Sequence, residues 1–141
     1  MNEILFFNEQ TNFKLNNPEV LKGWIVEVAK NENKKIGALN FIFCSDKYLL
    51  QLNLKYRDHD TLTDILTFDQ SEVSSEIGGD IYISVDRVKE NAPLYKSLMD
   101  KELYRVMVHG VLHLIGYPDS GESQKEEMRK KEEAYLSLLK F

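Results

Sequence analysis

Residues 106–121 read VMVHGVLHLIGYPDSG, and this stretch holds the most informative pattern in the chain. His109 and His113 are four residues apart in an apolar segment of helical periodicity, so their imidazoles lie on one helix face, one turn apart. Gly116 suits the left-handed position that ends a helix, and Asp119 follows in the returning chain. Two imidazoles and a carboxylate are typical ligands of Zn²⁺. The sequence therefore predicts a metal site on His109, His113 and Asp119.

The spacing H-x-x-x-H-x-x-G-x-x-D closely matches the zinc site of the metzincin peptidases, in which the third ligand also follows a glycine turn. Those enzymes have a glutamate directly after the first histidine, and it serves as their general base. This chain has Gly110 at that position. A metallopeptidase is therefore an alternative function, and Gly110 counts against it because another group would have to activate water.

Two other interpretations of the same residues stay open. A histidine on an apolar helix is usually a packed, hydrogen-bonded residue and not a ligand. Asp119 can instead orient a histidine from outside the ligand sphere, and His59 is then the only other histidine that can complete the set. If Asp119 binds directly, its charge makes a metal-bound water less acidic than at a three-histidine site.

Four strands are expected around this stretch. They are predicted at residues 3–7, 38–44, 65–68 and 80–85, where β-branched and aromatic side chains are frequent. Gly78 and Gly79 are expected in the polar connection before the last of these strands. Cys44, at the end of the second strand, should be a buried and unreactive thiol.

The helices are expected to alternate irregularly with these strands. One begins at Pro18 with Asn17 as N-cap, a second follows Ser45, and a short helical stretch covers residues 86–91 before Pro93. The longest runs over residues 101–114, and the last begins at Ser123, where Glu126 completes a capping box. The pattern predicts an α/β (α+β) fold, a small mixed sheet of about four strands with helices packed on it and a zincin-like metal helix.

Composition narrows the class of protein. With 141 residues, 43% hydrophobic and 29% charged, the chain is expected to form one globular domain over residues 1–141. One cysteine excludes an internal disulfide and favours a reducing compartment. No apolar run is long enough to span a membrane, and the first residues do not have the pattern of a signal peptide.

The net charge of −5 argues against a protein that holds nucleic acid through its overall field, but it allows a small basic groove. Arg57 ends the predicted second helix, and its planar guanidinium can hold a phosphate. Cations at helix C-termini are also common because of the helix dipole alone. The candidates for a basic groove are Lys55, Arg57, Arg87, Lys89 and Arg105.

Together these motifs resemble the YbeY endoribonucleases, the rRNA maturation factors of bacteria. The signature of that family is H-G-x-L-H-L-x-G-Y-D-H, and this chain has HGVLHLIGYPD at residues 109–119. The family stretches N-x-x-Y-R and T-D-V-L-S-F are similar to NLKYR at residues 53–57 and TDILTF at residues 63–68, and its G-D-I is similar to residues 79–81. The order and spacing agree over roughly residues 35–136.

The resemblance implies a cytoplasmic, metal-dependent, single-strand-specific endoribonuclease that acts in 16S rRNA 3′-end maturation and ribosome quality control. Its partners would be RNA and ribosomal particles. His109 and His113 match two of the metal ligands of the family, and Arg57 matches an arginine used in activity. The family usually has Asp-His where this chain has Pro118 and Asp119, so Asp119 takes the third position. The predicted catalytic residues are Arg57 and His113, and the predicted ligands of one Zn²⁺ are His109, His113 and Asp119.

The expected chemistry is Lewis-acid catalysis at a phosphodiester, with Arg57 stabilising charge on the non-bridging oxygens. The attacking group is either metal-bound water or the RNA 2′-hydroxyl, and the sequence leaves this choice open. A non-catalytic ribosome-assembly factor with a structural metal is a second alternative function. Structural zinc sites normally have four protein ligands, and the three evident here favour an open site.

Overall fold

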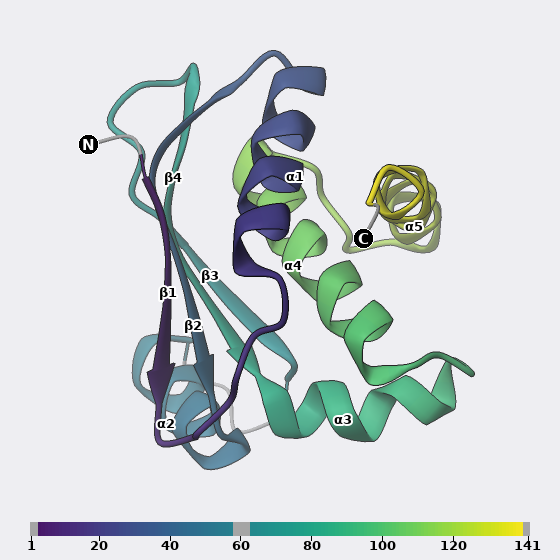
Figure 1. Cartoon of the computed structure of the whole chain (residues 1–141). Coiled ribbons are helices and arrows are strands. Elements are labelled where there is room, and N and C mark those ends of the chain that lie inside the picture. Colours follow the sequence, from purple (N-terminus) through teal and green to yellow (C-terminus); the bar gives the residue numbers. More distant parts are fainter. Residues whose placement is uncertain (1–2, 58–62, 140–141) are drawn as a thin grey trace.

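The computed structural model describes residues 3–57 and 63–139, and its frame is a four-stranded mixed sheet (Figure 1). The strand order is β1-β2-β4-β3, in which β1, β2 and β4 are parallel and β3 pairs antiparallel with β4. The strands are β1 (Glu3–Glu9), β2 (Lys35–Cys44), β3 (Ile65–Asp69) and β4 (Glu76–Ser84). The helices are α1 (Pro18–Asn31), α2 (Asp46–Arg57), α3 (Val85–Leu94), α4 (Met99–Ile115) and α5 (Glu122–Leu136).

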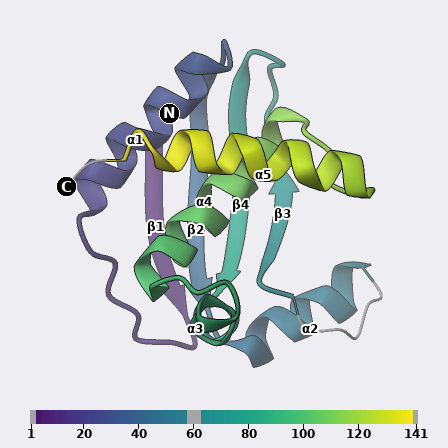
Figure 2. The same ribbon diagram turned by 90° about the vertical axis from the view of Figure 1, so that its right-hand side faces the viewer.

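The helices divide unequally between the two faces of the sheet. Helices α1 and α4 pack on one face, and α5 crosses α4 on the side away from the sheet (Figures 1 and 2). The main core lies under α1 and α4, and its largest fully buried side chains include Leu21, Ile25, Phe41, Ile81 and Met107. Helix α2 contacts β3 and β4 through a smaller cluster built on Cys44, Leu49 and Leu66. The expected α/β fold class is confirmed.

Helix α1 begins where the sequence predicted it, with Asn17 as its N-cap residue but without a side-chain capping bond. Pro18 stands in the first turn, where a fixed φ and a missing N–H cost nothing. Asn17 occupies the cap position with φ 54°, and its side chain makes no capping hydrogen bond. The backbone therefore enters this helix through a left-handed residue, a conformation that asparagine tolerates better than most residues do.

Within the described ranges, no helix combines the length and apolar character needed to cross a membrane.

Gly78 and Gly79 lie inside β4, which corrects the connection predicted for them. Gly79 has φ 138°, and a Cβ at this residue would lie 2.1 Å from the carbonyl oxygen of Phe68 on β3. Only glycine lets the two strand backbones approach so closely here. The sequence places the pair in the connection because it gives no sign of how closely the backbone of β3 approaches this residue.

Two predicted helix boundaries are wrong, and one is confirmed. Helix α3 runs on to Leu94 and includes Pro93 in its last turn. Helix α5 begins at Glu122 with Gly121 at the cap, so Ser123 lies inside the helix and the predicted capping box does not form. Gly116, with φ 120°, ends α4 as predicted.

Cys44 has the environment of an unreactive core thiol, as expected. It is fully buried at the end of β2 and forms no disulfide. Burial and the nearby charges of Asp86 and Asp46 raise the pKa of the thiol to about 12. The nucleophilic thiolate is therefore scarce at neutral pH.

Candidate metal centre

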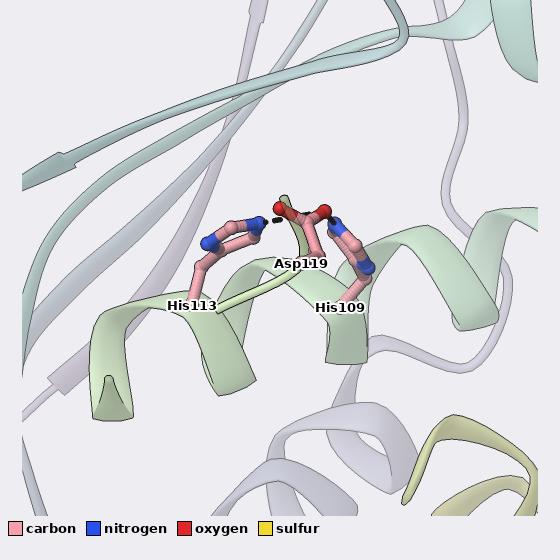
Figure 3. A group of neighbouring side chains, drawn as sticks. All are labelled: His109, His113 and Asp119. Carbon is pink, nitrogen blue, oxygen red and sulfur yellow. Dashed lines mark ion pairs between the residues drawn. The ribbon is translucent and has the colours of Figure 1, made fainter. Parts of the chain in front are cut away.

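Helix α4 presents His109 and His113 together, facing the loop that follows the helix (Figure 3). Their ring centroids are 4.7 Å apart. The Oδ2 atom of Asp119 lies 3.3 Å from Nε2 of His109 and 3.2 Å from Nε2 of His113. The fold thus brings together the three side chains that the sequence selected as metal ligands.

The three donor atoms fit a bound divalent cation. They all lie within 4.8 Å of one another. In a tetrahedral zinc site with bonds of about 2.0–2.1 Å, two ligand atoms are about 3.3–3.4 Å apart, close to the Asp119–histidine distances observed here. The side chains are 18% to 34% exposed, so solvent and substrate can reach them. The geometry therefore allows Asp119 to bind directly, and the assignment of the three residues as ligands stays a prediction.

Backbone hydrogen bonds at the end of α4 determine the path of the loop that carries Asp119. The N–H of Gly116 donates to the carbonyls of Leu112 and His113, and the N–H of Tyr117 also donates to the Leu112 carbonyl. These bonds satisfy carbonyl groups that the helix end leaves without partners, and they turn the chain back along α4. The left-handed conformation of Gly116 makes this turn possible and brings Asp119 to the histidines.

Tyr117 fixes the same loop to two other helices. Its hydroxyl donates to the Glu32 carboxylate at the end of α1, with an O–O distance of 2.5 Å. The hydroxyl of Tyr135 and the ammonium of Lys131, both on α5, donate to that carboxylate as well. Burial raises the pKa of Glu32, but these three hydrogen bonds outweigh it, and the pKa lies below its ordinary value. A charged Glu32 therefore anchors the Asp119 loop through Tyr117.

Glu132 on α5 is a site residue that the sequence analysis missed. Its Oε2 lies 2.5 Å from Nδ1 of His109, on the opposite side of the ring from Asp119. The side chain is only 3% exposed. Twenty-three residues separate His109 from Glu132, which stands in a charge-rich helix with no distinguishing motif. Glu132 is recognised as a neighbour of His109 only in the folded protein, where α5 crosses α4.

A buried arginine accompanies Glu132. Arg105 donates from Nη1 to Oε1 of Glu132 at 2.9 Å and forms a second ion pair with Glu102, which is 1% exposed. Burial raises the pKa of Glu132, but the hydrogen bonds and charges of His109 and Arg105 lower it by more than burial raises it. The pKa of Glu132 therefore lies below its ordinary value. Burial likewise lowers the pKa of Arg105, and the two glutamates more than reverse this effect. Both partners are therefore charged.

The basic surface beside the site differs from the predicted groove. Arg87 pairs with an aspartate of α2 at 3.1 Å, and Arg105 is held by two glutamates, so both predicted groove residues are engaged in internal ion pairs. A pocket of about 210 Å³ next to His109 is lined by Lys125 and Arg129 of α5. Besides Arg105, these two are the basic residues in the lining of this pocket, and neither was predicted from the sequence.

Two of the remaining predicted residues are absent from the lining of the pocket beside His109, and two fall outside the description. Arg57 is the last residue of α2, and its side chain falls outside the description, as does His59. Lys55 lies with its ammonium 5.2 Å from the ring centre of Tyr56, and Lys89 is exposed on α3. The role of Arg57 thus stays a prediction.

Gly110 distinguishes this centre from a peptidase site. A Cβ at this residue would lie 2.9 Å from Cδ1 of Ile65 and 2.9 Å from Cγ2 of Ile81. Position 110 therefore faces the sheet, and a glutamate side chain has no room there to act as a base. In the described part of the chain the candidate ligand group has three residues, whereas structural zinc sites normally have four protein ligands.

Comparison with known proteins places these features in a family. The family model for endoribonuclease YbeY matches residues 5–140. A relative from Cytophaga hutchinsonii, named endoribonuclease YbeY, is 53% identical over 98% of this chain and 96% of its own length. The endoribonuclease YbeY of Amoebophilus asiaticus is 51% identical over 94% of this chain and 90% of its own. A Thermotoga maritima protein solved in solution has a TM-score of 0.67 and 30% identity, covering 97% of this chain and 89% of that one. The chain described here therefore belongs to the endoribonuclease YbeY family.

Proposed function

We propose that this protein is a metal-dependent endoribonuclease that cleaves single-stranded RNA and acts in rRNA processing at the 16S 3′ end. The observation that carries the proposal is the open three-donor group of His109, His113 and Asp119 in a chain of this family. RNA and ribosomal particles are the proposed partners, and one domain carries the activity. A single buried, unpaired cysteine supports action in the cytoplasm, a reducing compartment.

Zn²⁺ is the proposed metal, held by Nε2 of His109, Nε2 of His113 and the Asp119 carboxylate. Two imidazoles and one carboxylate, with a position left for water or substrate, form a ligand set typical of catalytic zinc. When bound, the ion supplies Lewis-acid chemistry to a phosphodiester oxygen. The chain itself orders the ligands, because Gly116 turns the loop back and Tyr117 ties it to Glu32.

RNA cleavage by the purified protein tests this proposal. We expect a labelled single strand to be cut internally and the matching duplex to be spared, and we expect chelation to stop cleavage and added Zn²⁺ to restore it. The net charge of −5 predicts a weak salt dependence, equivalent to only a few phosphate contacts. End-group analysis identifies the nucleophile, since a 2′,3′-cyclic phosphate excludes attack by metal-bound water. Cleavage that continues after metal removal from folded protein would refute metal dependence.

Arg57 is the proposed phosphate-binding residue, and substitution tests it. Loss of a group that stabilises transition-state charge typically costs about 100- to 1000-fold, so we expect that decrease in kcat/KM for Arg57→Ala. Arg57→Lys keeps the charge but loses the planar fork of donors, so its activity should be intermediate. Lys47→Ala, at the exposed start of the same helix, is the control. If Arg57 only complements the helix dipole, both substitutions will leave kcat/KM unchanged, and only Arg57→Ala will lower stability.

A further inference from the structure

The two oxygens of the Glu132 carboxylate are committed to different partners. Oε2 contacts Nδ1 of His109 at 2.5 Å, and Oε1 accepts from Nη1 of Arg105 at 2.9 Å. The residue is 2% exposed, so water does not compete for either oxygen. A buried carboxylate with both oxygens occupied has a fixed orientation, and the histidine ring that it contacts is therefore fixed as well.

This contact selects one form of the His109 ring. A carboxylate accepts hydrogen bonds, so the proton of the neutral imidazole belongs on Nδ1. The lone pair is then on Nε2, which faces Asp119 and His113. A histidine binds a metal through its unprotonated nitrogen, and the hydrogen bond on the other nitrogen determines which one that is.

We propose that Glu132 is a positioning residue of the metal centre, which holds the Nδ1–H tautomer of His109 and aims its Nε2 at the cation. The proposal rests on the metal site of the proposed function. Glu132 does not touch the metal or the RNA in this assignment and acts only through His109. Arg105 supports this role because its ion pair keeps Glu132 charged and in place inside the protein, and Glu102 holds Arg105 through a second ion pair.

A purely structural role for Glu132 predicts a different result. Helix α5 is attached to the body by other contacts, including buried Met128 and Tyr135 and the hydrogen bond from Nε1 of Trp24 to the Tyr135 carbonyl at 2.8 Å. Loss of the Glu132 contact should therefore leave α5 in place. If Glu132 served only to join α5 to α4, its loss would lower stability and leave the metal affinity of the folded protein unchanged.

The first test compares Zn²⁺ affinity in Glu132→Gln and Glu133→Gln, measured by competition with a chromophoric chelator. Glutamine replaces one of the two carboxylate oxygens with an NH2 donor, which then faces either the N–H of His109 or that of Arg105, so the side chain cannot accept at both positions. We expect the dissociation constant for Zn²⁺ to rise about 10- to 100-fold in Glu132→Gln. Glu133 is exposed one residue further along α5, and Glu133→Gln should bind Zn²⁺ as the wild type does. Circular dichroism confirms that each variant is folded.

The second test needs no variant. In metal-free wild-type protein, two-bond proton–nitrogen correlation spectra report which ring nitrogen of His109 carries the proton. We expect the Nδ1–H form, whereas an Nε2–H form would overturn the proposal, as would an unchanged Zn²⁺ affinity in folded Glu132→Gln. A wild-type protein that shows the Nδ1–H form but binds no Zn²⁺ would instead refute the metal site on which the proposed function depends, and the role of Glu132 would be overturned with it.

Discussion

His113→Ala is expected to remove bound zinc and RNA cleavage together. One of the three proposed ligands is lost, and Asp119 also loses its contact with Nε2 at 3.2 Å. Changes to residues that only support metal ligands cost about 10- to 100-fold in affinity or activity, so loss of a ligand should exceed about 100-fold in both. Elemental analysis of the purified protein gives the zinc content per chain, and cleavage of a labelled single-stranded RNA gives the activity.

The substitution is informative because it should not unfold the protein. His113 is 30% exposed in the last turn of α4, and no large core side chain is removed. Lys130→Ala is a matched control, since Lys130 is 73% exposed and lies outside the pocket beside His109. One zinc per chain retained in His113→Ala would show that the ligand set is wrong. Cleavage retained at the wild-type rate by the same sample would point to a contaminating nuclease.

Gly110→Glu is expected to destabilise the protein strongly and not to convert it into a peptidase. The new Cβ would meet Ile65 and Ile81 at 2.9 Å, where α4 packs on the sheet. Overfilling a packed core costs about 1–3 kcal/mol. An unpaired buried carboxylate costs several kcal/mol more, so the free energy of unfolding should fall by more than about 3 kcal/mol. Urea denaturation followed by circular dichroism measures the change.

Gly23→Glu provides the matched control for this result. Gly23 also stands inside a helix, but a Cβ there would have no heavy atom within 4 Å. Glutamate has the higher helix propensity, so this variant should be as stable as the wild type or more stable by up to about 1 kcal/mol. A Gly110→Glu variant that folds normally and hydrolyses casein would restore the peptidase alternative.

The helix that carries the histidines was predictable because its signals are local. A continuous apolar periodicity defines α4, and Gly116 marks its end. The strands were predictable in number and approximate position for a similar reason, since their composition differs from that of the neighbouring segments. Predictions failed where a neighbouring element overrides a local signal. Gly79 is assigned to the polar connection before β4 unless the close approach of the Phe68 carbonyl is known.

The sequence by itself determined that His109 and His113 share a helix face, that the chain turns at Gly116, and which family signature the motif matches. Helical periodicity and backbone φ preferences depend on residues close together in the chain, so sequence reasoning reaches them. Only the tertiary structure decided that Glu132 lies against His109, that Arg105 serves a buried carboxylate, and that Gly110 faces the sheet. These contacts depend on how α5 crosses α4 and how α4 lies on β3 and β4. The packing of the whole core fixes those arrangements, and no short stretch of sequence encodes them.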